Sequence, residues 1–363
     1  MKKTPPAFER ILVVNPFGIG DVIFTMSLVE ALRREKPQAF IGFVCNERAA
    51  DLVLMNTAID KTYVFNRDRY RKLWKKHPFL FYRKLKAFFD LLKSERFQGV
   101  MDLSLGREVG FFARAAGIPE RVGFDYKGRG TFLTRKIKLE GYEGKPVAEI
   151  QMDLLRLISM KIPAEPLKLS LKAPQAAVTG AEMFLKKNGF HESDKILAVA
   201  PGGGRSWGAD AVYKQWDPGY FASAAETFCR ARPAKVLLLG DRTEKNLLEE
   251  VKRLIKIPCL VITGAGLDEV AALLLKSSAL ICNDGGLLHL ANALGVKTVS
   301  IFGPVDEKVY GPYGGDAARV VLTQNVPCRP CYQRFHFPPC PYERRCLSRL
   351  PVQAAVEALL KIV

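Results

Sequence analysis

The sequence contains no apolar run approaching the roughly 20 residues that a membrane-spanning helix requires. Its first segment, MKKTPPAFER, is basic, but two prolines and a glutamate stand where a secretory signal would have an unbroken apolar stretch. Internal repeats and low-complexity tracts are also lacking, and 48% hydrophobic with 25% charged residues is an ordinary globular composition. We therefore expect a soluble or peripheral protein, and a length of 363 residues suggests two domains.

The cysteine pattern does not suggest a disulfide scaffold, because half of the eight cysteines are scattered through apolar segments. In strand-like or helical surroundings of this kind a thiol acts as a small buried hydrophobe. The four residues concerned are Cys45, Cys229, Cys259 and Cys282. This usage suits a reducing cytoplasm.

The remaining cysteines form a cluster, Cys328-x2-Cys331-x8-Cys340-x5-Cys346. The first pair has a spacing found among metal ligands. The second pair does not repeat that spacing, and no glycine knuckle follows. Two hypotheses stand: a structural zinc ion held by the four thiols, or reduced thiols packed in a proline-rich loop.

Positive charge is in excess, with 55 Lys and Arg against 37 Asp and Glu and a formal net charge of +18. Such a chain favours an anionic partner: nucleic acid, acidic lipid headgroups or a phosphorylated small molecule. Residues 67–93 mix basic and aromatic side chains as an interfacial segment does. The ordinary alternative is an amphipathic helix whose aromatic face is core and whose lysines are solvated.

Strand-like and helix-length segments alternate through both halves of the chain, which predicts parallel sheets covered by helices on both faces. In the first half the expected strands are 11–15, 41–46, 61–65 and 99–104, and the expected helices are 21–35 and 79–94. In the second half the strands are 195–202, 235–240, 259–264, 279–284 and 298–303, and helices fill the intervals between them.

Residues 163–176 contain three prolines and no helical period, so we expect a linker there. The predicted domains are residues 1–170 and 171–363, and it stays open whether the last helix packs back on the first domain. Two doubly wound domains in tandem would face a central cleft, with ligands at the carboxyl ends of the strands.

The first strand-to-helix loop reads Asn15-Pro-Phe-Gly-Ile-Gly-Asp21. Its two glycines and the free amides of a helix N-terminus suit an anion. A dinucleotide fingerprint would need a third glycine where Ile23 stands, although Glu47 could imitate the ribose-binding acid. Asp21 would also repel a pyrophosphate. It is either a base exposed at the cleft or a simple helix cap.

The second half has three comparable loops. Asp284 can cap a helix while Gly285 and Gly286 leave its first amides bare for a phosphate, and His289 follows on that helix. A glycine-rich turn at 201–205 followed by Lys214-Gln-Trp suits a diphosphate, and Glu244 after the next strand could bind ribose hydroxyls. The alternatives are a packed core histidine, a solvated lysine and a first-turn glutamate that complements the helix dipole.

The motifs NPFGIGDV, GFDYKGRGTFLTRKI, KQW and NDGGLLHLANALGVKTVSIFGPVDEKVYGPYG follow one another along nearly the whole chain. Together they resemble glycosyltransferase family 9, whose best-known members are ADP-heptose:lipopolysaccharide heptosyltransferases. The resemblance implies a GT-B fold, in which two Rossmann-like domains face a central cleft, the first binding mainly the acceptor and the second mainly the nucleotide sugar.

The resemblance also implies roles for individual residues. Asp21 matches the proposed general base, Lys214 the donor-phosphate ligand and Glu244 the nucleoside ligand. The late motif, which binds the diphosphate, maps onto Asp284, Gly285, Gly286 and His289. Gly285 stands where many members carry Thr or Ser, so one hydroxyl contact to phosphate is missing. Arg121, Lys127 and Arg129 are either ligands of acceptor phosphates or carboxylates, or turn charges.

The expected protein is therefore an inverting glycosyltransferase that moves a heptose from ADP-heptose to the lipopolysaccharide inner core. It would work at the inner face of the cytoplasmic membrane, on an anionic surface and without nucleic acid. No Asp-x-Asp motif is present, so no essential metal is expected. The alternatives are a family 9-like transferase with another nucleotide sugar or glycolipid acceptor, a nicotinamide oxidoreductase, and a non-enzymatic basic protein that binds membrane or nucleic acid.

Overall fold

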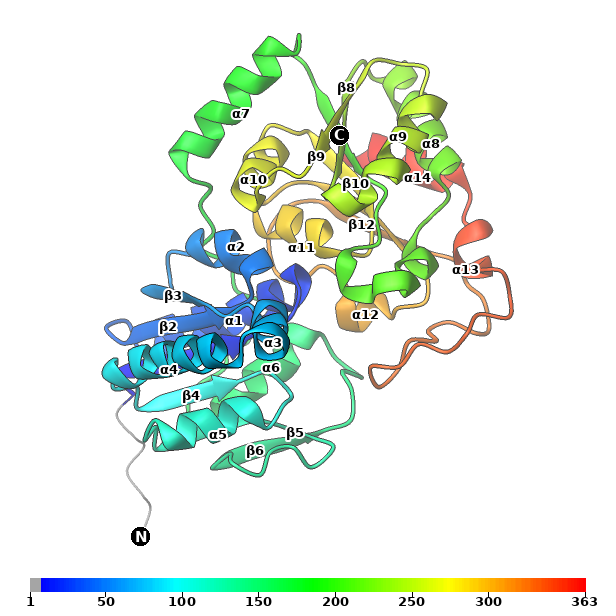
Figure 1. Cartoon of the computed structure of the whole chain (residues 1–363). Coiled ribbons are helices and arrows are strands. Elements are labelled where there is room, and N and C mark those ends of the chain that lie inside the picture. Colours follow the sequence, from blue (N-terminus) through cyan, green and yellow to red (C-terminus); the bar gives the residue numbers. More distant parts are fainter. Residues whose placement is uncertain (1–7) are drawn as a thin grey trace. The chain divides into compact units, whose positions relative to one another are not determined.

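The computed structural model describes residues 8–363, apart from the side chains of residues 67, 68, 205, 206 and 209. The chain forms two compact units, one up to Tyr142 with Val147–Ser170, the other of Glu143–Pro146 with Leu171–Val363. Each unit contains one six-stranded sheet, and every strand pairing in both sheets is parallel. The predicted pair of helix-covered parallel sheets is confirmed (Figure 1).

The first sheet has the order β3-β2-β1-β4-β5-β6. Its strands are β1 (Arg10–Asn15), β2 (Phe40–Cys45), β3 (Lys61–Val64), β4 (Gly99–Asp102), β5 (Glu120–Tyr126) and β6 (Arg135–Leu139). The helices are α1 (Ile19–Glu35), η1 (Glu47–Ala49), α2 (Ala50–Leu54), α3 (Arg67–Lys76), α4 (Pro78–Ser94), α5 (Glu108–Ala115) and α6 (Val147–Arg156). Alternate residues of a strand point to opposite faces, and Leu12 and Val14 of β1 pack toward α4 and α5.

The second sheet has the order β12-β11-β10-β7-β8-β9. Its strands are β7 (Ile196–Ala200), β8 (Lys235–Gly240), β9 (Cys259–Thr263), β10 (Ala279–Asn283), β11 (Thr298–Phe302) and β12 (Arg319–Thr323). The helices are α7 (Gln175–Lys187), η2 (Arg205–Lys214), α8 (Pro218–Ala231), η3 (Arg242–Glu244), α9 (Lys245–Leu254), α10 (Leu267–Leu275), α11 (Gly286–Ala293), α12 (Glu307–Tyr310), α13 (Arg345–Ser348) and α14 (Val352–Ile362).

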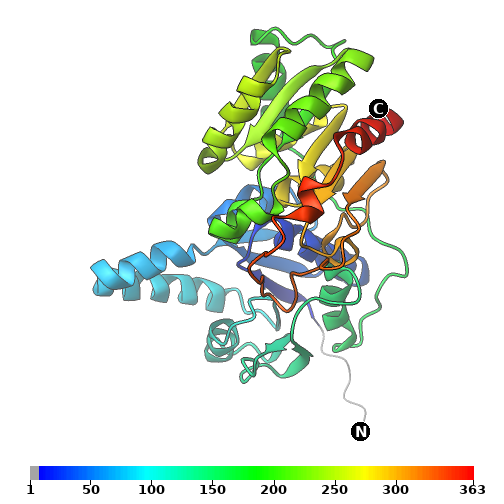
Figure 2. The same cartoon turned by 90° about the vertical axis from the view of Figure 1, so that its right-hand side faces the viewer.

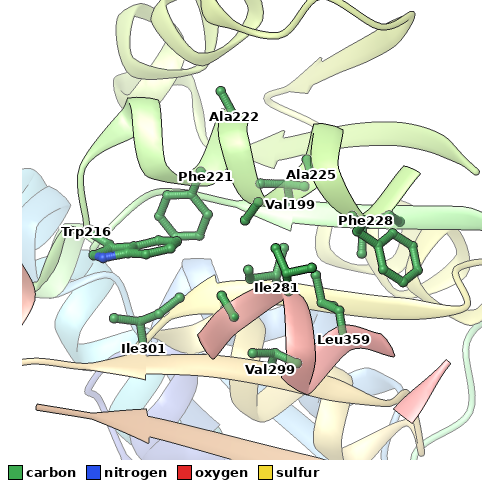
Figure 3. Packing of buried hydrophobic residues seen from close by; sticks show 14 of the residues in the cluster. Val199, Trp216, Phe221, Ala222, Ala225, Phe228, Ile281, Val299, Ile301 and Leu359 are labelled. Carbon is green, nitrogen blue, oxygen red and sulfur yellow. The ribbon is translucent and has the colours of Figure 1, made fainter. Parts of the chain in front are cut away.

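The core of the second unit lies between this sheet and helices α8 and α14. Trp216 and Phe221 pack edge to face, with ring centroids 5.2 Å apart, beside Ile301 of β11 (Figure 3). Leu359 of α14 lies in the same cluster as Phe228 of α8. The last helix therefore buries its apolar face in the second unit.

None of the helices formed by residues 8–363 is both long enough and apolar enough to cross a bilayer.

Candidate active site

Three loops of the second unit leave the carboxyl ends of neighbouring strands. Strand β7 lies between β10 and β8 in the sheet, and all three run in the same direction. The loops that follow them carry the glycine turn at 201–204, Glu244 and the segment that starts at Asp284. The parallel topology thus gathers at one edge the groups that the sequence spread over more than eighty residues.

Asn283, the last residue of β10, binds two of these loops together. Its Oδ1 accepts a hydrogen bond from the Trp216 amide at 3.0 Å, and its Nδ2 donates to the carbonyl oxygens of Pro201 at 2.7 Å and Gly202 at 3.3 Å. The Asn283 side chain is buried. Sequence reasoning gave this residue no role, although a buried amide at the end of an apolar strand must find hydrogen-bond partners nearby.

Lys214 and Asp284 form a buried ion pair at the same edge. The Lys214 Nζ lies 2.7 Å from Asp284 Oδ2, and the two side chains are only 7% and 6% exposed. Trp216, two residues after Lys214, is fully buried in the core and fixes the end of η2. The Lys214 ammonium also lies 4.6 Å from the centre of the Trp207 ring. The lysine is therefore held at the edge of the sheet, and the solvated-surface alternative is wrong.

His289 lies on α11 with its Nε2 4.0 Å from Asp284 Oδ1. Burial, together with the positive charge of Lys214, lowers the pKa of His289 to about 4, while the Asp284 carboxylate opposes this shift. The imidazole is therefore neutral at physiological pH. It can donate or accept one hydrogen bond, but it adds no second positive charge beside Lys214.

Glu244 serves as part of a cap and also faces the glycine turn. Its carboxylate accepts a hydrogen bond from the Asp241 amide at 3.1 Å, which completes a capping box at η3, and another from the Gly204 amide at 3.3 Å. A Cβ on Gly202 would lie 1.9 Å from the same carboxylate. Glu244 therefore lies in the first turn of η3, as the helix-dipole alternative predicted, and its carboxylate also contacts the glycine turn at 201–204.

The two glycines that open α11 leave its first amides without flanking side chains. Gly285 has φ 179° and ψ −179°, an extended conformation that any residue adopts. The nearest heavy atom to a Cβ built on Gly285 is the Asn283 carbonyl oxygen at 4.0 Å. Neither the backbone conformation nor the surrounding space therefore requires a glycine at position 285. A serine hydroxyl would fit there, next to Gly286 at the first position of α11.

In the first unit, Asp21 lies in the first turn of α1, directly beyond the end of β1. Its Oδ2 accepts a hydrogen bond from the Gly18 amide at 3.3 Å, so the capping interaction that the sequence allowed is present. Behind it, the Asn15 side chain donates to the Thr25 hydroxyl at 2.7 Å, and Thr25 donates to Gln151 at 2.8 Å. This buried network fixes the loop. The half-buried Asp21 side chain keeps part of its surface exposed.

The structure separates the three basic residues expected at the acceptor. The Arg121 guanidinium donates to the carbonyl oxygens of Phe132 at 2.7 Å, Ile118 at 2.5 Å and Pro119 at 3.0 Å. Arg121 also lies at the start of β5, at the end of the sheet opposite to Asp21, so it anchors a turn. Lys127 and Arg129 follow the carboxyl end of β5, are exposed, and flank the Tyr126 ring at 5.1 and 5.5 Å.

The zinc hypothesis for the cysteine cluster is unsupported. All four thiols line one small cavity together with Arg329, Tyr213 and Phe337. Within residues 8–363, however, no group of three or more His, Cys, Asp or Glu side chains is placed to hold a metal ion. Burial and the neighbouring cysteines raise the pKa of Cys346 to about 11, and burial also raises that of Cys331. The thiols of Cys331 and Cys346 are therefore protonated at neutral pH.

Comparison with known proteins identifies the family. The model of glycosyltransferase family 9 (heptosyltransferase) matches residues 85–337. Lipopolysaccharide heptosyltransferase 1 of Pseudomonas aeruginosa is 25% identical over 337 residues, covering 90% of this chain and 86% of that protein. The match to lipooligosaccharide heptosyltransferase 2 of Campylobacter jejuni, 27% identical over 203 residues, covers 54% of this chain and only 56% of that protein.

The fold agrees with this assignment. The structure of the Escherichia coli ADP-heptose lipopolysaccharide heptosyltransferase II superposes with a TM-score of 0.76 at 18% identity, over 97% of this chain and 98% of that one. Each of the two units of this chain therefore has the Rossmann-like architecture of a GT-B protein. Because the family model covers well over half of the sequence, the chain belongs to glycosyltransferase family 9 and is a glycosyltransferase.

Proposed function

We propose that this enzyme transfers a heptose from ADP-heptose to the inner core of a lipopolysaccharide precursor, with inversion at the anomeric carbon. The buried Lys214–Asp284 pair beside the bare N-terminus of α11 carries the proposal, because it is a preformed site for a diphosphate. The relatives named as lipopolysaccharide heptosyltransferases support the sugar and the acceptor class.

The donor half of the reaction belongs to the second unit. Cleavage of the bond between the sugar and the diphosphate leaves a new negative charge on the departing nucleotide. Lys214 and the first amides of α11 stabilise that charge, a role that a divalent cation has in other enzymes. Glu244 binds the nucleoside hydroxyls. The lowered pKa of His289 keeps its imidazole neutral, so it does not compete with the Lys214 ammonium for the Asp284 carboxylate. The neutral imidazole contributes a hydrogen bond to the diphosphate.

The acceptor half belongs to the first unit. Asp21 takes the proton of the acceptor hydroxyl as that oxygen attacks the anomeric carbon from the face opposite to the diphosphate. The proton passes to the Asp21 carboxylate, the new C–O bond forms, and the electron pair of the old bond leaves with the diphosphate. Lys127 and Arg129 bind anionic groups of the acceptor. The lipid-anchored acceptor places the enzyme at the inner face of the cytoplasmic membrane.

Thermal unfolding in the presence of candidate donors tests this function. A ligand at 100 times its Kd stabilises the folded state by about 2.7 kcal/mol, a readily measured shift. We expect ADP and ADP-heptose to stabilise the protein and UDP, GDP and reduced nicotinamide cofactors to have no effect. A protein stabilised by another nucleotide sugar would retain the family and change the donor. A protein stabilised by the nicotinamide cofactor alone would overturn the proposal.

A further inference from the structure

The α3–α4 hairpin, residues 67–94, carries much of the positive charge of the chain. It contains ten Lys or Arg and two Asp, a net charge of +8 out of +18 in 28 residues. The two helices lie side by side and extend away from the sheet of the first unit (Figure 2). Helix α4 has no fully buried residue along its whole length, which is unusual for a helix of 17 residues in a folded domain.

Aromatic contacts hold the hairpin together and attach its base. Trp74 packs on Phe81 with ring centroids 5.2 Å apart, which joins the two helices near their connection. At the other end, Phe88 packs against Phe65 at 5.1 Å and joins the core beside β3. The hairpin is therefore a defined structure whose free end is made by the end of α3 and the start of α4.

The free end exposes large apolar rings among basic side chains. Phe79 is 82% exposed, Tyr82 57% and Trp74 49%. Around them lie the exposed side chains of Lys75, Lys76, Arg83 and Lys84. Solvation explains the lysines, but it gives no reason to leave three large aromatic side chains in water at the same place.

We propose that the free end of the α3–α4 hairpin docks on an anionic lipid bilayer. Charge complementarity favours this occupant, because clustered Lys and Arg are attracted to acidic headgroups within a Debye length. The aromatic rings distinguish a bilayer from a soluble polyanion, because Trp, Tyr and Phe insert at the boundary between headgroups and acyl chains. The inference draws on the proposed function only for the lipid-borne acceptor, and lipid binding is measured without donor or acceptor.

Sedimentation with phosphatidylglycerol vesicles tests the proposal on the full chain. We expect binding at low salt and release near 0.5 M salt, where the Debye length is about 4 Å. Each basic residue at the surface changes partitioning about five-fold. The variant Lys75→Glu, Lys76→Glu, Arg83→Glu and Lys84→Glu should therefore lose at least about 100-fold in vesicle affinity. Its turnover on a detergent-solubilised acceptor should be unchanged.

A matched control separates this patch from the overall charge. Lys186→Glu, Lys187→Glu, Lys252→Glu and Arg253→Glu reverse three lysines and one arginine on α7 and α9, all exposed. This variant has the same net charge and should retain most of the vesicle binding. Equal losses in the two variants would overturn the proposal, because binding would then follow net charge alone.

Phe79→Ser tests the apolar part at constant charge. Removing the ring should weaken vesicle binding about ten-fold, since burial of a phenyl ring contributes roughly that factor. Binding that is unaffected by Phe79→Ser and equally strong to heparin would identify a soluble polyanion as the partner. Self-association that the hairpin variant abolishes, with no lipid binding, would identify a second copy of the chain. Either result overturns the lipid proposal without affecting the transfer reaction.

Discussion

The two units share one strand order but place charged side chains differently at the carboxyl edges of their sheets. In the second unit the loops bind one another: Asn283 bridges Trp216 and the glycine turn, and Lys214 pairs with Asp284 in a buried position. In the first unit Asn46, directly after β2, likewise donates to the carbonyl oxygens of Pro16 and Phe17 in the loop after β1. The half-buried Asp21 accepts a hydrogen bond from the Gly18 amide. Lys127 and Arg129 lie on an exposed turn.

This difference fits the two ligands of the proposed reaction. A nucleotide diphosphate is small and constant, so a rigid site with fixed charges binds it without reorganisation. The acceptor is larger and carries its own charges, and exposed side chains adapt to it. The buried pair has a cost, because an ion pair removed from water gains little over an apolar replacement. We therefore assign the pair to the proposed donor binding rather than to stability.

The largest expected effect comes from the acceptor side. Asp21→Asn should lower turnover by about 10²- to 10⁴-fold, because the amide cannot accept the acceptor proton. The affinity for ADP should stay at the wild-type value, since the proposed donor ligands lie in the second unit. Asp268→Asn is the matched control, because Asp268 also lies in the first turn of a helix that follows a parallel strand. Wild-type turnover in Asp21→Asn would reduce Asp21 to a helix cap.

The next effect tests the rigid pair. Lys214→Met should lower kcat/KM by about 10²-fold, because the loss of one group that stabilises the developing charge costs about this factor in other enzymes. It should also destabilise the fold by about 3 kcal/mol, because Asp284 is left buried and unpaired. The double variant Lys214→Met with Asp284→Asn should recover most of the stability and none of the activity. Recovery of activity would show that the pair acts only on stability.

Much of this comparison could be predicted from the sequence. Alternating strand-like and helix-length segments predicted nine of the twelve strands in the described residues, because buried parallel strands read as short apolar runs. The strands β5, β6 and β12 were not predicted. Lys214, Asp284 and His289 were predicted as donor ligands from glycines at strand ends and from the family resemblance. The structure places Lys214 Nζ and His289 Nε2 at 2.7 and 4.0 Å from Asp284, and their binding of a donor stays a prediction. Arg121 fits the turn-charge alternative, because it lies directly before the buried residues 122–124 of β5, a strand that the alternation did not predict. Asn283 was missed because its partners are distant in sequence.

A smaller effect concerns the two glycine turns. Gly285→Ser should lower the Kd for ADP about three- to ten-fold, because the added hydroxyl supplies one more hydrogen bond to phosphate. The backbone and the surrounding space accept the side chain. Gly202→Ala is the counterpart: its Cβ would collide with the Glu244 carboxylate, so donor affinity should fall. Weaker ADP binding by Gly285→Ser would mean that the phosphates lie away from the first turn of α11.

The smallest effect is a pH dependence of stability with opposite sign in the two units. His289 has its pKa lowered to about 4 by burial, and burial raises the pKa of Asp102 to about 6, against the opposing hydrogen bond from the Ser104 amide. Between pH 6.5 and about 4, unfolded histidine binds a proton that folded His289 does not. Its contribution to the free energy of unfolding therefore falls as the pH falls through this window.

Asp102 behaves in the opposite way. Between pH 6 and about 4, the folded carboxyl keeps a proton that the unfolded side chain has lost, so its contribution rises as the pH falls. Urea unfolding of wild type, His289→Gln and Asp102→Asn at pH 7.0 and 4.5 separates the contributions of His289 and Asp102 to the free energy of unfolding from those of the other titratable groups. The stability difference between wild type and His289→Gln should decrease at the lower pH, and that between wild type and Asp102→Asn should increase. Changes of the same sign in both pairs would contradict a lowered pKa for His289 on α11 and a raised pKa for Asp102 at the end of β4.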